Sequence, residues 1–224
     1  MSLFTIGDLH LSLGEDKPMD IFSGWKDYVN RIYENWQKQV SQEDTVVIVG
    51  DISWAMRLSD AKEDFNFINN LNGTKIILKG NHDYWFDTKT KTDLFLQNNN
   101  FNSIKILFNN SYEYENYSIC GTRGWINETG EDDVKIINRE VGRLKLSLQS
   151  ATKLPIAFLH YPPVYCNNEC SPIMQVLQQY NIKNCYYGHI HGNGHKYSVN
   201  GIYKNINFAL VASDYVNFTP IKIL

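Results

Sequence analysis

Cysteine is scarce in this chain, and neither a long apolar run nor an excess of one charge is present. The four cysteines in 224 residues do not have the spacing of a disulfide scaffold, which excludes a small disulfide-rich domain. No run approaches the roughly 18 apolar residues of a membrane span, so we expect no membrane partner. The net charge of −3 creates no field that attracts polyanions. Nucleic acid is therefore a possible but disfavoured partner.

The first residues lack the features of a secretory signal. Residues 1–6 lead directly into Gly7 and Asp8, without a basic region, a long apolar stretch or a cleavage site. With so few cysteines, this predicts a cytoplasmic protein. Cys166 and Cys170 lie close in sequence. They are either a redox or zinc pair, although the second pair of a tetrahedral zinc site is lacking, or two unrelated thiols.

Hydrophobic residues make up 43% of the chain, which is enough for a large core. Apolar residues spaced by three and four predict helices at about 21–40 and 134–148, with shorter helices at about 59–71 and 171–180. Strand and helix alternate in the first half, whereas strands dominate the last third. This pattern predicts a layered α/β fold with mixed sheets, and the lack of a linker predicts a single domain over 1–224. The predicted strands are 4–6, 46–49, 75–78, 104–108, 117–120, 156–159, 184–187, 203–206, 208–212 and 221–224.

Five of the predicted strands end in residues that can bind metal. The carboxyl ends of strands in layered α/β folds open onto a common crevice, so these residues can converge there. Four of the five strand ends also contain glycine, which permits a sharp turn and a close backbone approach. In order, the five stretches are Gly7-Asp8-Leu9-His10, Gly50-Asp51, Gly80-Asn81-His82-Asp83, His160, and Gly188-His189-Ile190-His191.

The residue types at these strand ends suit divalent transition metals. Aspartate, histidine and asparagine supply oxygen and nitrogen donors, and thiolate is absent. Five of the six histidines lie in these stretches, and the remaining one, His195, is interpreted as a loop residue. A single histidine beside a strand is usually structural, but five such coincidences are not expected by chance. The set therefore predicts a metal centre.

In this order, the five stretches resemble the calcineurin-like metallophosphoesterases. The family pattern is D-x-H, G-D, G-N-H-[DE], an isolated histidine and G-H-x-H, and the match runs from Asp8 to His191. The resemblance implies the metallo-dependent phosphatase fold: a four-layer α/β/β/α sandwich of two mixed sheets flanked by helices. It also implies two metal ions bridged by Asp51. One ion would be held by Asp8, His10, Asp51 and His191, and the other by Asp51, Asn81, His160 and His189.

The resemblance further implies hydrolysis of phosphate mono- or diesters by a metal-bound hydroxide, without a covalent enzyme intermediate. Two divalent ions, two aspartates and one hydroxide leave a small positive excess, because Asn81 adds no charge. Such a centre still attracts a phosphoryl group. Manganese, iron, zinc and nickel all accept these ligands, so the metal identity stays open.

By the same resemblance, His82 protonates the leaving alcohol or stabilises the transferring phosphoryl group. Asp83 would hold that imidazole in position and favour its protonated form. Alternatively, Asp83 is a turn or helix-capping residue. Arg57 and Arg123 are candidate phosphate clamps, or equally members of surface salt bridges. Trp54, Trp85, Trp125 and Tyr161 form either an aromatic rim that stacks on a base or part of the core.

The second stretch departs from the protein phosphatases of the superfamily. It continues Ile52-Ser53-Trp54-Ala55 and lacks their D-R-G sequence, and the third stretch ends in Asp83 rather than glutamate. We therefore expect a small phosphate-ester substrate, for example a nucleotide, rather than a phosphoprotein. The alternatives are a catalytically silent scaffold that binds protein and a nuclease on short nucleic acid. The oligomeric state does not follow from the sequence.

Overall fold

Two mixed β-sheets form the middle of the protein in the computed structural model, which describes residues 1–126 and 131–224. The first sheet has the order β13-β1-β2-β3-β4. Strands β1 to β4 are parallel, and β13 pairs with β1 in the antiparallel direction. The strands are β1 (Leu3–Ile6), β2 (Thr45–Ile48), β3 (Thr74–Ile77), β4 (Ile104–Ile106) and β13 (Ile221–Lys222).

The second sheet has the order β11-β12-β10-β7-β6-β5. Its four central strands are parallel and both edge strands are antiparallel. A separate short hairpin joins β8 (Val164–Tyr165) and β9 (Asn168–Glu169). The strands of the sheet are β5 (Ser111–Tyr114), β6 (Tyr117–Thr122), β7 (Leu154–Leu159), β10 (Asn184–Tyr187), β11 (Gly201–Tyr203) and β12 (Ile206–Leu210).

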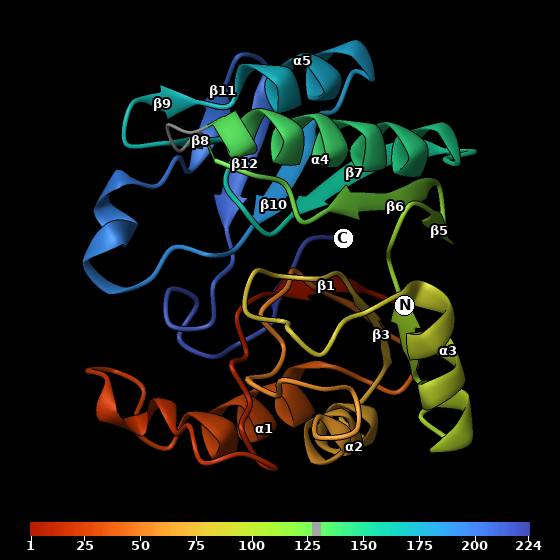
Figure 1. The fold of residues 1–224 in the computed structure, drawn as a ribbon, viewed down its shortest axis with the longest axis vertical. Coiled ribbons are helices and arrows are strands. Elements are labelled where there is room, and N and C mark those ends of the chain that lie inside the picture. The colour runs from red at the N-terminus through yellow and green to blue at the C-terminus, as the bar shows by residue number, and fades with distance from the viewer. Residues whose placement is uncertain (127–130) are drawn as a thin grey trace.

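Helices cover the outer faces of both sheets, which gives four layers (Figure 1). Three helices lie on the first sheet: α1 (Tyr28–Gln39), α2 (Lys62–Asn70) and α3 (Lys89–Asn98). Two lie on the second: α4 (Glu131–Gln149) and α5 (Ser171–Gln179). Two short 3-10 helices are η1 (Met19–Ile21) and η2 (Gly192–Tyr197). The predicted α/β/β/α sandwich is therefore confirmed.

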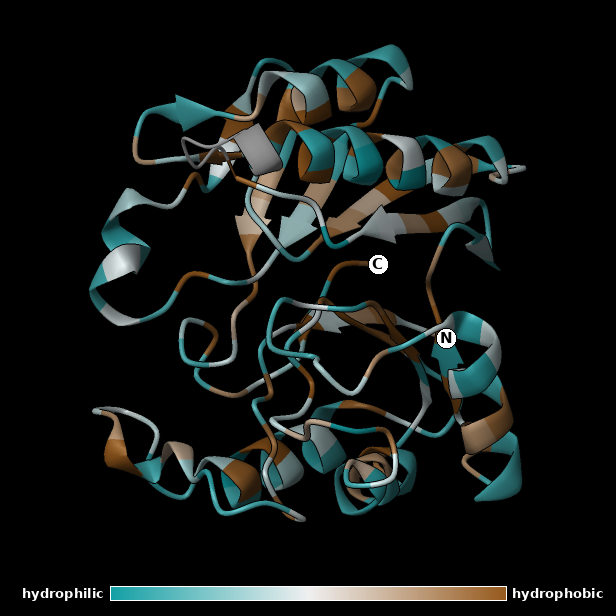
Figure 2. Ribbon diagram, viewed as in Figure 1, coloured by the Kyte–Doolittle hydropathy of each residue, from teal (hydrophilic) through white to brown (hydrophobic). Residues whose placement is uncertain are grey.

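The side chains of each strand point alternately to the two faces of its sheet, and both faces are buried. In β1, Phe4 and Ile6 join the apolar cluster shared with α1 and α2, whereas Leu3 joins the cluster between the two sheets. Successive side chains of a strand point to opposite faces, so a continuous apolar run supplies both clusters. Figure 2 shows the resulting brown strands between mixed helices.

The first predicted helix begins later than its apolar spacing indicated. Helix α1 starts at Tyr28, and residues 22–27 form a loop after η1. Ile21 was predicted to lie on the buried face, but it is 77% exposed. The N-terminal part of the predicted helix is therefore wrong, because its apolar residues line a cavity instead of one helix face.

Other differences reflect weak sequence signals. Helix α3 was not predicted, since only its residues 94–96 form an apolar stretch. The predicted strand at 203–206 is interrupted by the turn between β11 and β12, because Lys204 and Asn205 both have positive φ angles. All four cysteines are free, with Cys166 exposed and Cys170 buried, so no disulfide joins that pair. Among the helices of the described residues, none combines the length and apolar character needed to cross a bilayer.

Candidate metal centre

All seven predicted ligands lie just after the carboxyl ends of strands, where the two sheets meet. The sheets are joined there by Gly7, which follows β1. Its N–H donates to the carbonyl of Val211 at 2.7 Å, and its carbonyl accepts from Ser213 N at 3.0 Å. The ends of β1 and β12 are thus held together, which brings the first ligand stretch against the last one.

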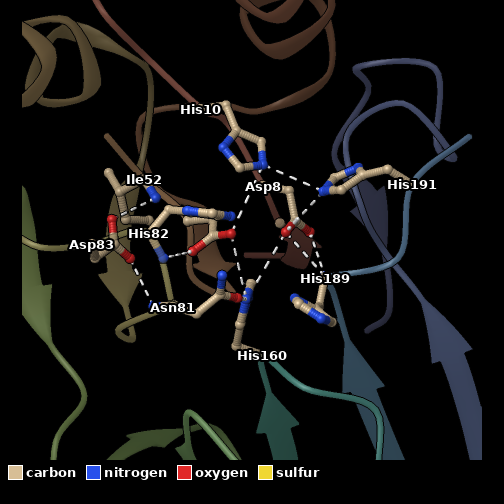
Figure 3. A network of polar contacts seen from close by, with 12 residues as sticks. Asp8, His10, Ile52, Asn81, His82, Asp83, His160, His189 and His191 are labelled. Atoms are coloured by element: carbon tan, nitrogen blue, oxygen red, sulfur yellow. Dashed lines mark hydrogen bonds and ion pairs between the residues drawn. The ribbon is translucent and has the colours of Figure 1, made fainter. Parts of the chain in front are cut away.

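Two compact groups of donor atoms result. The first consists of Asp8, His10 and His191, whose donor atoms all lie within 4.8 Å of one another. The Nε2 atoms of His10 and His191 are 3.3 Å apart, and Nε2 of His191 lies 3.5 Å from Oδ1 of Asp8. Figure 3 shows the two rings pointing toward each other beside Asp8.

The second group consists of Asp51, His160 and His189, also within 4.8 Å of one another. Nε2 of His160 lies 3.5 Å from Oδ2 of Asp51 and 2.6 Å from Oδ1 of Asn81. Asn81 therefore faces this group, as the resemblance implied.

Asp51 lies between the two groups. Its Oδ2 is 3.5 Å from His160 and 3.8 Å from Nε2 of His10, and its Oδ1 accepts from His82 N at 2.8 Å. Burial, together with the nearby charges of Asp83 and Asp8, raises the pKa of Asp51 well above its ordinary value. A carboxylate whose charge is so disfavoured gains most from a cation beside it. A bridging role for Asp51 remains a prediction that this geometry supports.

The donor chemistry fits cations better than hydrogen bonds. Nδ1 of His160 faces the carbonyl oxygen of Val49 at 3.0 Å, so Nδ1 carries the proton of the neutral ring. Its Nε2 is then an acceptor that faces another acceptor, the oxygen of Asn81. Burial lowers the pKa of both His160 and His189 to about 3, which keeps the rings neutral and their lone pairs free. Such contacts between acceptors repel unless a cation lies between them.

The backbone around the ligands is strained and tightly packed. Asp8, His10, Asp51 and His189 all have φ angles between 47° and 73°, a region that non-glycine residues rarely occupy and that clusters at functional sites. A Cβ atom on Gly80 would lie 2.1 Å from Oδ1 of Asp51, and one on Gly188 would lie 2.4 Å from Oδ2 of Asp8. Both glycines are needed for the carboxylates to approach the backbone.

Asp214 is a functional residue that the sequence did not reveal. Its Oδ1 lies 2.8 Å from Nδ1 of His191, while its Oδ2 accepts from Gly192 N at 2.9 Å and lies 3.2 Å from Nε2 of His195. Burial acts to lower the pKa of His191, but Asp214 and Asp8 outweigh it and raise the pKa to about 10. A field that attracts a proton so strongly also attracts a metal ion. His195 thus belongs to this network and not to a plain loop.

Asp83 makes different contacts from those predicted. Its carboxylate accepts from Ile52 N at 2.8 Å, Gly80 N at 2.7 Å and Trp85 Nε1 at 2.8 Å, on the outer side of the cluster in Figure 3. Nδ1 of His82 is buried without a hydrogen-bond partner among the described residues. Burial lowers the pKa of His82, and the charge that opposes this is that of Asp8. The turn alternative therefore describes these contacts of Asp83, none of which is to His82, and its predicted support of that imidazole stays a prediction.

The two candidate clamps occupy different surroundings. Nη2 of Arg123 lies 3.5 Å from Oε1 of the buried Glu140, and its guanidinium lies over Trp125 at 5.0 Å. The side chain of Arg57 is exposed and forms no ion pair within the part of the chain that the structure describes. The salt-bridge alternative thus describes Arg123, and a phosphate contact of Arg57 stays a prediction.

The four aromatic residues separate into rim and core. Trp54 stacks on His10 with ring centroids 5.0 Å apart and lies 4.4 Å from His82. Tyr161 contacts His189 at 4.1 Å and packs against Trp125. Trp85 is a buried core residue. Trp54 and Tyr161 therefore contact residues of the centre, whereas Trp125 packs against Tyr161 and Trp85 lies in the core.

Comparison with solved structures shows the same fold in proteins of distant sequence. A protein of unknown function from Aquifex aeolicus is 18% identical, with a TM-score of 0.56, and the match covers 99% of this chain and 95% of that one. The phosphopantetheinyl hydrolase of Mycobacterium tuberculosis is 12% identical, with a TM-score of 0.57 and coverages of 100% and 95%. A Thermus thermophilus protein is 8% identical, with a TM-score of 0.61 and coverages of 99% and 97%.

Comparison with curated proteins found no match. The family model for calcineurin-like phosphoesterases matches residues 1–193, a range that contains every predicted ligand. The chain therefore belongs to the calcineurin-like phosphoesterase family, which supports a metal-dependent hydrolase that acts on phosphate esters.

Proposed function

We propose that the protein hydrolyses small phosphate mono- or diesters at a pair of metal ions held by the two donor groups. The observation that carries this proposal is the pairing of the groups across Asp51, with His82 beside them. Bound transition-metal ions would supply an activated water and polarise the phosphoryl oxygens. The complete ligand set favours this activity over a silent scaffold.

The residues of the chain prepare the site in three ways. Val49 and Asp214 fix the orientations of His160 and His191, so the donor atoms need little rearrangement on binding. Asp83 shapes the turn that carries Asn81 and His82. His82 offers an imidazole that the protein itself leaves without a partner on Nδ1, and we assign it to the transferring phosphoryl group or the leaving oxygen.

The test is hydrolysis of a panel of mono- and diesters by protein reconstituted with manganese, iron, zinc or nickel. The His82→Ala variant should lower kcat by about 10²- to 10⁴-fold, the usual contribution of a positioned acid or base. Its metal content, measured by elemental analysis, should stay unchanged. Equal loss of metal and activity would make His82 a structural residue. Inactivity on every ester with every metal would overturn the proposed function.

A further inference from the structure

A cavity of about 430 Å³ opens directly beside the candidate metal centre. Its lining includes His10 and His191 from the first donor group, together with His82. It also includes Met19, Phe22 and Trp25, from the segment that precedes α1, and Trp25 packs edge-on against His10 and His191 with ring centroids 5.7 Å apart. A molecule in this cavity would contact both the candidate reacting groups and apolar side chains.

Apart from the candidate metal ligands, the described residues that line the cavity offer no free charge to a bound molecule. Asp214 is the one carboxylate among them, and its Oδ1 faces Nδ1 of His191 while its Oδ2 accepts from Gly192 N. None of these described lining residues is a lysine or an arginine. A second phosphate or another charged group would lose its hydration there without gaining a partner.

The apolar wall continues onto the surface. Phe22, Met19 and Trp54 also line a neighbouring hollow of about 320 Å³, together with Ile21 and Pro18. The charged Asp16 and Lys17 line this second hollow but do not line the first cavity. Phe22 is 53% exposed and Ile21 is 77% exposed. Exposed apolar side chains that gather at the mouth of a cavity mark a binding surface. This segment lies before α1, at the lower left of Figure 1, and part of it is brown in Figure 2.

We propose that this cavity receives the alcohol or phenol part of the substrate and selects uncharged, apolar groups. The inference rests on the proposed function, because the leaving group must depart beside His82. Phe22, Met19 and Trp25 would determine specificity by excluding water from the leaving group. Trp54 would form one wall of the cavity, held in place by its stacking on His10.

The first test compares phenyl, 4-ethylphenyl and 4-butylphenyl esters, as phosphates and as methyl diesters. Their phenols ionise at nearly the same pH, so the leaving groups are about equally reactive. Differences along the series therefore report the burial of the alkyl group. Each methylene that enters an apolar cavity should raise kcat/KM about fourfold. Glyceryl esters, whose alcohol is polar, should be poor substrates.

The second test uses variants of exposed residues, which are expected to fold. Phe22→Ala should flatten the rise along the series, so that the kcat/KM values of the phenyl and 4-butylphenyl esters become similar. The matched control is Ile202→Ala on β11, since Ile202 is 82% exposed and belongs to neither hollow. The control should retain the full rise. A rise that persists in Phe22→Ala would overturn the assignment to this cavity.

A binding measurement separates this inference from the proposed function. Binding of 4-butylphenol, an uncharged product, is titrated by tryptophan fluorescence in metal-free protein and in Phe22→Ala. Binding that weakens in Phe22→Ala supports the cavity even if no ester is hydrolysed, a result that would overturn only the proposed function. The opposite result would be hydrolysis of phenyl esters with no increase in kcat/KM along the series and no binding of 4-butylphenol. It would overturn the inference and leave the proposed function intact. The apolar wall would then belong to a contact with another protein.

Discussion

The two donor groups differ in how the protein supports them. His160 of the second group is fully buried, and its Nδ1 is held by the main-chain carbonyl of Val49. His191 of the first group is 31% exposed, and its Nδ1 is held by the side chain of Asp214. One group therefore depends on backbone that the strands fix, and the other on a side chain 23 positions away.

This difference shows which group depends on the backbone and which depends on single side chains. A carbonyl at the end of β2 cannot be lost by mutation, so the second group follows from the fold. The first group faces the cavity and depends on Asp214 and on the loop before α1. Under the proposed function the first group would hold one ion and the second group the other, called the first and the second ion below.

The largest effect is expected where the two groups meet. Asp51→Ala removes the carboxylate that lies within 3.8 Å of both His10 and His160. Both ions should be lost or weakened, and activity should fall on the order of 10³-fold, because several kcal/mol of charge stabilisation disappear. Elemental analysis and turnover measure this together.

Asp93→Asn is the control for Asp51→Ala, since Asp93 is an exposed carboxylate on α3. It should leave metal content and turnover unchanged. Retention of both ions in Asp51→Ala would show that the two groups bind independently and that Asp51 does not bridge them.

A matched pair of glycine variants should disturb the two groups to different extents. In Gly80→Ala the new Cβ would lie 2.1 Å from Asp51, and in Gly188→Ala it would lie 2.4 Å from Asp8. Overpacking of this kind costs about 1–3 kcal/mol of unfolding free energy. Gly80→Ala should weaken both ions through Asp51, whereas Gly188→Ala should mainly weaken the first, as followed by metal titration and thermal unfolding.

Gly142→Ala provides the reference for both glycine variants. A Cβ at this position in α4 meets no atom within 4 Å, so alanine should stabilise the helix by up to about 1 kcal/mol. If the three variants had equal stability and metal content, the tight packing at Gly80 and Gly188 would be shown not to matter for either property.

Local patterns were enough to predict most of the fold and the residues that the two donor groups bring together. The strand ends at Asp8, Asp51 and Asn81 carry short motifs whose residue types and spacing specify metal chemistry directly. The apolar runs before them specify buried strands. Both signals are contained within a few residues, so neither depends on knowing the tertiary structure.

The remaining features depend on contacts between distant segments. Nothing near Asp214 in sequence indicates that it reaches His191, and Asp83 satisfies turn amides that only the folded loop brings together. The apolar spacing of Ile21 and Trp25 imitates a helix face, although these residues line hollows beside the metal centre. The wrong helix boundary therefore coincides with the proposed specificity region, where function overrides local propensity.

Asp214→Asn should weaken only the first group. Asparagine removes the charge that holds Nδ1 of His191, and loss of such an outer partner costs about 10- to 100-fold in metal affinity. Competition with a chromophoric chelator should show one weakened ion and one unchanged ion. Equal weakening of both would mean that Asp214 acts through the whole fold, which thermal unfolding would reveal as a loss of stability.

The smallest effect is expected from Tyr28→Phe. The hydroxyl of Tyr28 donates to the carbonyl of His10 at 2.9 Å, so it connects α1 to the strained backbone of the first group. Its loss should cost about 0.5–1.5 kcal/mol of unfolding free energy and slightly weaken the first ion. Tyr112→Phe is the matched control, because Tyr112 donates to Ile106 O at 2.9 Å on the far strands. It should lower stability to a similar extent without changing metal affinity. Identical metal titrations of the two variants would show that α1 supports the fold but not the first group, and the contrast between the groups would then depend on Asp214 alone.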